Sequence, residues 1–206
     1  MRILYFDSDI PSVYFPVGIP ESGGTCAFAT KKCLEYCPSG NSRNKNELYT
    51  LNYFKENDSK TICSKILKDY KELIKRPYHA KMIQWHVWGD CLPELTEKEY
   101  KVIMALHEAS IPQYGFTRNK ELWQLIPRLD NLNIGYTLDN LRKAIKLSIE
   151  SGKMTASPDY EHGYALMIFD GKIRSRCNGW WCITEKGEER NSDCRLCLEE
   201  HSGCYT

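Results

Sequence analysis

The chain has 206 residues, which is enough for one domain that buries a hydrophobic core of its own and folds without cross-links. A hydrophobic fraction of 42% and a charged fraction of 27% argue against a disordered chain, and a net charge of +1 argues against a protein that binds nucleic acid or anionic membranes by charge alone. Ten cysteines are the unusual feature of the composition.

The N-terminus has none of the features of a targeting segment. Its apolar run is too short for a signal-peptide core, because Asp7 and Asp9 interrupt it. No stretch of the chain reaches the roughly 18 apolar residues of a membrane span. We therefore expect a cytoplasmic protein with no membrane partner. Disulfides rarely persist in the cytoplasm, so a disulfide framework is the weaker explanation of the ten cysteines.

One strand and two helices are expected in the N-terminal part. The strand covers Ser12–Gly18 and is followed by a Cys-rich loop. The helices cover Glu47–Asn57 and Ser59–Lys75, and the second has an apolar stripe at helical spacing: Ile62, Ile66, Leu67, Tyr70, Leu73 and Ile74. Cys63 lies on this helix, where a free thiol is expected to be a small buried hydrophobe.

Strand-like and helix-like segments alternate in the middle of the chain. Aromatic and β-branched residues predict a strand over 81–88, and further strands are predicted at Gln113–Thr117, Asn133–Thr137 and Gly163–Phe169. This alternation favours an α/β fold with a parallel sheet and helical crossovers.

Three helices are predicted between these strands, over 96–107, 118–127 and 139–152. Thr96 and Glu99 have the spacing of a capping box at the start of the first of them. The chain becomes poor in aliphatic residues after Asp170. We therefore expect a main domain over residues 1–170 and a small Cys-rich extension over 171–206 that a metal holds together.

Small and polar residues follow the ends of the predicted strands, where parallel α/β sheets bind their ligands. The candidates for a binding site are Gly89, Asp90, Thr117, Arg118, Thr137 and Asp139. Structural alternatives stay open for several of them, since Gly89-Asp90 can be a turn, Thr117-Arg118 can begin a helix and Asp139 can cap one. His86 is either a ligand-binding residue or a hydrogen-bonded core histidine.

Three cysteines, Cys26, Cys33 and Cys37, lie close together after the first predicted strand. Three thiolates suit a metal site with one open coordination position. The metal would be a catalytic zinc ion or a four-iron, four-sulfur (4Fe-4S) cluster with one iron free to hold a small molecule. Three unligated thiols are the structural alternative.

Five more cysteines crowd the C-terminal end: Cys177, Cys182, Cys194, Cys197 and Cys204. Cys194 and Cys197 are spaced as a metal knuckle, and four of the five thiols can close a structural zinc site or a second 4Fe-4S cluster. The spacing does not select the four ligands. The role of Cys91, next to Asp90, stays open.

Several segments resemble the phage gene-product-eighty-eight-like family. They are 25–27, 33–37, 84–90, 114–118 and 133–139, which run Thr-Cys-Ala, Cys-Leu-Glu-Tyr-Cys, Gln-Trp-His-Val-Trp-Gly-Asp, Tyr-Gly-Phe-Thr-Arg and Asn-Ile-Gly-Tyr-Thr-Leu-Asp. That family looks like a compact relative of radical S-adenosylmethionine (SAM) enzymes. The resemblance implies a partial parallel β/α barrel, a 4Fe-4S cluster on the first three cysteines and SAM on its open iron. The tail is similar to auxiliary-cluster modules, which implies a second cluster.

Three functions follow from these patterns. The first is a small radical SAM-like enzyme in a bacterial or phage-infected cell, with an electron donor and a small-molecule or peptide substrate, in which Asp90, Arg118 and Asp139 position SAM or substrate. The second is a non-catalytic iron–sulfur protein for electron transfer or redox sensing. The third is a zinc protein that binds nucleic acid or another protein, although the net charge of +1 argues against nucleic acid.

Overall fold

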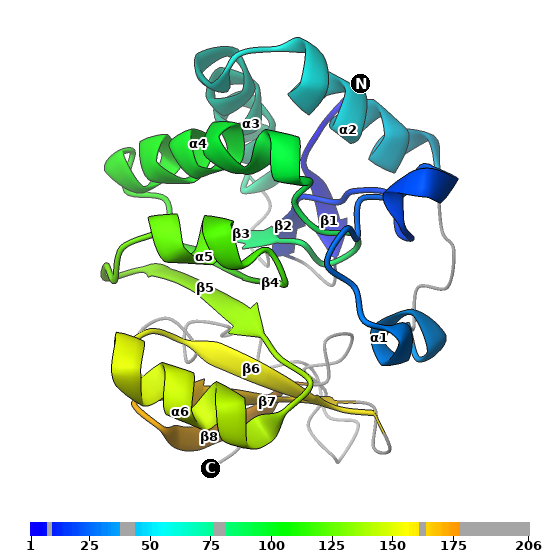
Figure 1. Ribbon diagram of the computed structural model, residues 1–206. Coiled ribbons are helices and arrows are strands. Elements are labelled where there is room, and N and C mark those ends of the chain that lie inside the picture. The colour runs from blue at the N-terminus through cyan, green and yellow to red at the C-terminus, as the bar shows by residue number, and fades with distance from the viewer. Residues whose placement is uncertain (8–9, 38–43, 76–80, 161–163, 178–206) are drawn as a thin grey trace, which may run out of the picture.

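The computed structural model describes residues 1–7, 10–37, 44–75, 81–160 and 164–177. Within them the chain forms a mixed α/β structure built on one eight-stranded sheet (Figure 1). The strands are β1 (Tyr5–Asp7), β2 (Ile10–Ser12), β3 (Ile83–Trp85), β4 (Gln113–Thr117), β5 (Leu132–Thr137), β6 (Thr155–Asp159), β7 (Tyr164–Phe169) and β8 (Lys172–Cys177).

Six α-helices lie between the strands of the described part: α1 (Lys31–Glu35), α2 (Lys45–Glu56), α3 (Ser59–Leu73), α4 (Thr96–Glu108), α5 (Lys120–Leu125) and α6 (Leu141–Ser151). Short polar side chains start most of them by accepting hydrogen bonds from free backbone N–H groups of the first turn. Asn44 forms a capping box with Glu47 on α2, and Asp58, Asn119 and Asn140 cap α3, α5 and α6.

The strands are arranged in the sheet in the order of the sequence, from β1 to β8. Strands β2 to β6 pair in parallel, while β1, β7 and β8 are joined to them by antiparallel pairing. Right-handed crossovers that always advance in one direction place their helices on one face of a sheet. Because β2 to β6 run parallel, their carboxyl ends all lie at one edge of the sheet. In Figure 1 the arrow of β5 points toward the side on which α1 lies.

The main hydrophobic core lies between the sheet and helices α2 to α5. Ile83 and Trp85 on β3 face Phe54, Ile66 and Ile103 within it, and Cys63 lies at its border as a buried thiol, as expected. A smaller cluster contains Met82, Tyr114, Met154, Met167 and Phe169. Both faces of the central strands are thus buried, which is typical of parallel sheets.

Most predicted elements are confirmed, with changes at their boundaries. The strand predicted over 81–88 ends at Trp85, because His86 adopts a left-handed backbone with φ of 53°. The first parallel strand is β2, which ends where the predicted strand begins, and β1, β6 and β8 were not predicted. No helix in the described ranges is long and apolar enough to cross a membrane.

Two helix starts differ from the prediction. The capping box at Thr96 and Glu99 is wrong, because α4 has no side-chain cap and Glu99 is turned into the core. The cap of α6 is Asn140 rather than Asp139, which leaves the Asp139 carboxylate available for other contacts.

The predicted boundary at residue 170 falls in the turn between β7 and β8, so the sheet continues to Cys177. Nothing is described of the Cys177 side chain. Cys182, Cys194, Cys197 and Cys204 lie outside the described residues, and the metal-binding extension stays a prediction.

Gln113 joins the sheet to α4, and its replacement gives a test of the fold. Its side chain accepts a hydrogen bond from Trp85 Nε1 and donates one to the Ile103 carbonyl, both at 2.9 Å. Gln113→Met leaves the buried Trp85 N–H and Ile103 carbonyl without hydrogen-bond partners. We therefore expect it to lower the free energy of unfolding by about 1–3 kcal/mol in urea titration. Gln124→Met, on the exposed face of α5, is the matched control. Equal stabilities of the two variants would contradict this packing.

Candidate functional site

Asp90 lies buried where three segments meet at the carboxyl edge of the sheet. Its carboxylate accepts hydrogen bonds from Thr117 Oγ1 at 2.6 Å, from the Arg118 backbone N–H at 2.7 Å and from the Cys91 N–H at 2.8 Å. Its own N–H donates to Thr25 Oγ1 at 3.0 Å. Asp90 therefore fastens the end of β4 and the loop before Cys26 to the segment that follows β3.

Gly89 has a structural role beside this carboxylate. Its φ is 73°, and a Cβ atom there would lie 2.6 Å from both the Phe15 carbonyl oxygen and Thr25 Oγ1. Glycine alone adopts this backbone without strain and allows the Cys-rich loop to approach so closely. Gly89 thus lies in a bend with a positive φ, and this bend places Asp90.

Arg118, Asp139 and Tyr160 form a hydrogen-bonded group beyond the ends of β4, β5 and β6. Arg118 Nη2 donates to Asp139 Oδ1 at 2.6 Å and to Tyr160 Oη at 2.9 Å, and Tyr160 Oη donates to Asp139 Oδ1 at 2.8 Å. Burial raises the pKa of Asp139, but hydrogen bonds from Thr30, Arg118 and Tyr160 outweigh it and lower the pKa overall. Asp139 is therefore a carboxylate at neutral pH.

Helix α1 brings the second cysteine to this group. Thr30 caps the helix by accepting from the Cys33 N–H at 3.1 Å, and its side chain lies close enough to Asp139 to help lower the pKa of that carboxyl. The Tyr36 ring packs against the Tyr160 ring with centroids 5.5 Å apart. Burial raises the pKa of the Cys33 thiol, while the nearby positive charge of the Arg118 guanidinium acts in the opposite direction. Cys33 therefore lies beside the Arg118 group.

The three predicted ligands lie in one neighbourhood. Cys26, Cys33 and Cys37 are all partly exposed. Burial, with smaller contributions from the charges of Asp90, Cys33 and Cys37, raises the pKa of Cys26 to about 12. Cys33 lies on α1, whereas Cys37 lies beyond the end of this helix at Glu35.

The donor type of these thiols fits a soft metal, since thiolates bind zinc and iron–sulfur clusters. The thiols are not consumed in disulfides and lie close enough to affect each other electrostatically. No group of three or more Cys, His, Asp or Glu side chains in the described ranges is arranged as a metal site. The ligand set therefore stays a prediction.

His86 and Glu99 form a buried pair beneath the carboxyl edge. His86 Nε2 lies 2.5 Å from Glu99 Oε1, and Nδ1 lies 3.0 Å from the Phe116 carbonyl and 3.9 Å from Asp90 Oδ1. Both ring nitrogens face acceptors, so one proton between Nε2 and Oε1 joins the two side chains, while Glu99 Oε2 stays buried with no hydrogen-bond partner among the described residues. Burial lowers the pKa of His86, but the Glu99 carboxylate outweighs it and raises the pKa to about 9.

Two other candidates contribute less to the site. Thr137 ends β5, but its side chain makes no hydrogen bond within the described part of the chain. Cys91 is fully buried, and its Sγ donates to the Leu92 carbonyl at 3.4 Å. Burial and the nearby Glu99 and Asp90 charges raise its pKa well above the usual value, so Cys91 is an inert core thiol.

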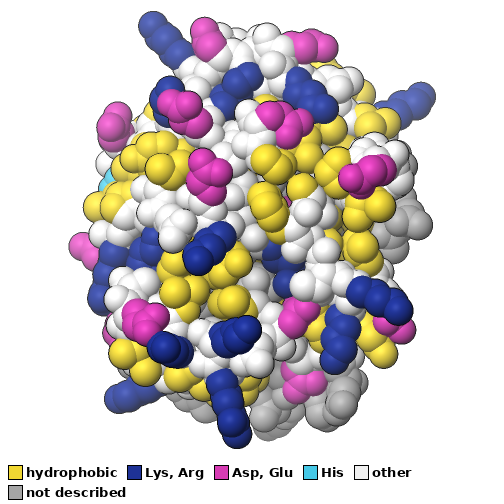
Figure 2. Space-filling view, viewed as in Figure 1, with side chains coloured by type: hydrophobic (Ala, Val, Ile, Leu, Met, Phe, Trp, Pro, Cys, Tyr) yellow, Lys and Arg dark blue, Asp and Glu magenta, His cyan; other side chains and the backbone are white. Residues whose placement is uncertain are grey.

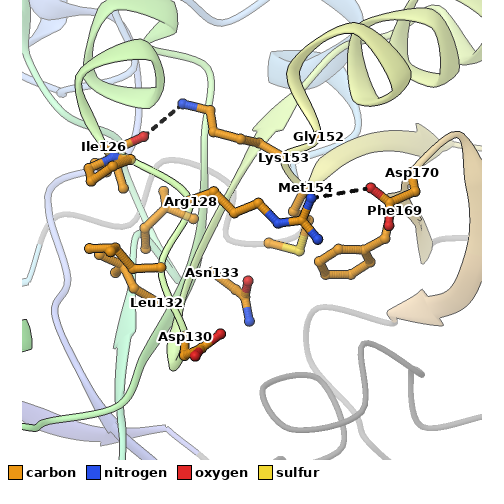
Figure 3. A pocket seen from close by; sticks show the side chains of 13 residues that line it. Ile126, Arg128, Asp130, Leu132, Asn133, Gly152, Lys153, Met154, Phe169 and Asp170 are labelled. Atoms are coloured by element: carbon orange, nitrogen blue, oxygen red, sulfur yellow. Dashed lines mark hydrogen bonds and ion pairs between the residues drawn. The ribbon is translucent and has the colours of Figure 1, made fainter.

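A small pocket of about 80 Å³ lies at the opposite edge of the sheet (Figure 3). Its two basic side chains are already engaged within the protein. Lys153 Nζ donates to the Ile126 carbonyl at 2.8 Å and lies 4.1 Å from the centre of the Trp123 ring, and Arg128 pairs with Asp170 at 3.6 Å. These contacts close the end of α5, so the pocket has a structural explanation.

Sequence comparison identifies one family. The family described as gene product 88 matches residues 7–200. Comparison with curated proteins and with solved structures gave no match. Residues 7–200 include all six candidate binding residues and seven of the eight candidate ligands, the exception being Cys204.

The His86–Glu99 pair predicts a pH dependence of stability. Folded His86 keeps its proton above the usual pKa of 6.5, whereas the unfolded chain loses it. Its stabilising contribution is complete below pH 6.5 and is lost as the pH rises toward 9. The free energy of unfolding should fall by roughly 1 kcal/mol per pH unit between pH 6.5 and 8, before titration of Lys153 opposes it.

Denaturant titrations across this range test the pair. Glu99→Gln should remove the slope, whereas Glu97→Gln, which is exposed on the same helix, should keep it. A slope that persists in the Glu99 variant would show that another group produces it.

Proposed function

We propose that this chain, which belongs to the gene product 88 family, is a small iron–sulfur protein with radical SAM-like chemistry at the carboxyl edge of its sheet. Cys26, Cys33 and Cys37 would hold the cluster, and the Arg118 group would bind the small molecule beside it. The open sheet with its sequential strand order would correspond to a partial β/α barrel.

One observation carries this proposal. The Cys33 thiol lies within electrostatic reach of the Arg118 guanidinium, and the same guanidinium donates hydrogen bonds to Asp139 and Tyr160. These side chains come from four separate segments, after β2, β4, β5 and β6. In α/β folds the carboxyl ends of parallel strands are where ligands bind and chemistry takes place. These positions support a soft-metal donor set of thiols beside the oppositely charged Arg118 and Asp139, at the carboxyl edge of the sheet.

The charges suit a ligand that has both a cationic and an anionic group. Asp139 offers a carboxylate to an ammonium group, and Arg118 offers a planar guanidinium to a carboxylate. The amino-acid end of SAM has both groups. A 4Fe-4S cluster on three thiolates supplies single electrons and leaves one iron open to a ligand. The protein side chains bind and orient the ligand, and the buried Asp90 fixes the Arg118 backbone behind them.

The alternatives use the same thiols differently. A non-catalytic iron–sulfur protein would bind the cluster without SAM, and a zinc protein would bind no iron. Nucleic acid is the less favoured partner of a zinc protein, because acidic and basic side chains are interspersed over the face in Figure 2 and the net charge is +1.

Metal analysis after anaerobic purification separates iron from zinc. We expect iron together with acid-labile sulfide, and Cys33→Ala should lose the iron of one cluster because only two thiolates remain. Cys63→Ala removes a thiol from the core border on α3 and should keep the full iron content. Zinc in place of iron, or an unchanged iron content in the Cys33 variant, would contradict the assignment.

SAM binding is tested by electron paramagnetic resonance of the reduced, reconstituted protein. SAM should change the cluster signal, and Asp139→Asn should raise the SAM concentration needed by about 10-fold or more, because a hydrogen bond to a charged group is lost. Arg118→Lys should have a similar effect, with Arg142→Lys on exposed α6 as its matched control. If SAM does not change the cluster signal of the fully reconstituted wild-type protein, electron transfer is favoured over radical chemistry.

A further inference from the structure

A second concave site lies at the same edge of the sheet, on the side of β1 and β2. It has a volume of about 450 Å³ and is walled by four aromatic side chains, Tyr5, Phe6, Tyr14 and Trp88. All four are partly exposed. Pockets of roughly 300–1,000 Å³ with aromatic walls and a few polar groups are the usual form of small-molecule sites. None of these residues belongs to the Arg118 group.

The position of the pocket follows from the topology. Tyr14 follows β2 and Trp88 follows β3, so both lie beyond carboxyl ends. Tyr5 begins β1, which runs antiparallel, and pairs with Ser12 at the end of β2. The sequence Trp88-Gly89-Asp90 joins the pocket directly to the Asp90 junction. The pocket and the thiols thus share one edge of the sheet.

The rings enclose a space with walls at an angle to each other. Tyr14 meets Trp88 edge-on, with centroids 6.4 Å apart and planes at 67°, and Tyr5 meets Tyr14 at 6.3 Å and 53°. Such walls can contact a flat ligand on its face and its edge at once. Asn46 at the rim has a side-chain amide with no hydrogen-bond partner among the described residues, so it can bind polar atoms of the ligand.

Aromatic walls also suit cations, but the remaining lining argues against one. Glu47 is the only carboxylate among the described lining residues, and both of its oxygens accept hydrogen bonds from Asn44, at 3.1 and 2.8 Å. Both residues lie at the N-terminus of α2, a helix of 12 residues whose dipole places partial positive charge there. The carboxylate keeps its charge, but these hydrogen bonds hold it and only 2% of Glu47 is exposed, so it is poorly presented to a cation in the pocket and we expect a neutral ring.

We infer that this pocket binds a planar, neutral heteroaromatic ring system of the nucleobase class. The ring stacks on Trp88 and Tyr14, and its polar edge faces Asn46. The pocket needs no metal, so this inference is independent of the proposed iron–sulfur chemistry.

Inosine, a soluble neutral purine nucleoside, tests the pocket in titration calorimetry of the full chain, with ribose and choline as comparisons. We expect saturable binding of inosine and none of ribose. Trp88→Ala and Tyr14→Ala should each lower the affinity for inosine at least about fivefold, since each removes a stacking surface. Tyr100→Ala, a partly exposed tyrosine of α4 outside the pocket, is the matched control and should leave affinity unchanged.

Asn46→Ala keeps the test valid if the aromatic variants fold poorly. Because Asn46 is exposed, this variant should lower the affinity for inosine without affecting the melting temperature. Absence of inosine binding, unchanged affinity in the pocket variants, or tighter binding of choline than of inosine would each overturn the inference. These outcomes leave the metal analysis unaffected, so the two proposals fail separately.

Discussion

The carboxyl edge of the sheet depends on one buried carboxylate, Asp90. A buried charge is costly unless hydrogen bonds replace the water it loses, and Asp90 receives three, from Thr117, Arg118 and Cys91. Its backbone N–H also holds Thr25, the residue before the first cysteine of the loop. The carboxylate is satisfied only if the Cys-rich loop, the segment after β3 and the end of β4 meet, so it determines where the candidate site residues lie.

The rest of the site follows from that junction. Arg118 gives its backbone N–H to Asp90 and its guanidinium to Asp139 and Tyr160, so one residue transmits the position of the buried carboxylate to the exposed group. Thr30 caps α1 close to Asp139, which places Cys33 near the guanidinium. Below the edge, His86 lies between the acidic Glu99 and Asp90 and offsets their charge. The same edge continues through Trp88 into the aromatic pocket.

The alternation of strands and helices and the polar residues at strand ends could be predicted, because burial periodicity and the parallel topology appear directly in the sequence. Strand β6 was missed because it contains Pro158, which argues against a strand interior. Here β5 pairs with β6 only at Thr155 and Ala156, so no ladder bond is lost at the proline. Tyr160 was missed along with that strand. The contacts of Glu99 and Thr30 could not be predicted, because both come from tertiary packing and their local sequence is typical of helix starts.

The central claim is that the three thiols at the carboxyl edge hold an iron–sulfur cluster next to Arg118 and Asp139. Anomalous X-ray diffraction from crystals of the anaerobically reconstituted protein, collected at the iron and zinc absorption edges, tests it most directly. The account predicts an iron signal between Cys26, Cys33 and Cys37, within reach of the Arg118 group. A signal at the zinc edge alone, or an iron signal confined to the C-terminal cysteines, would contradict it.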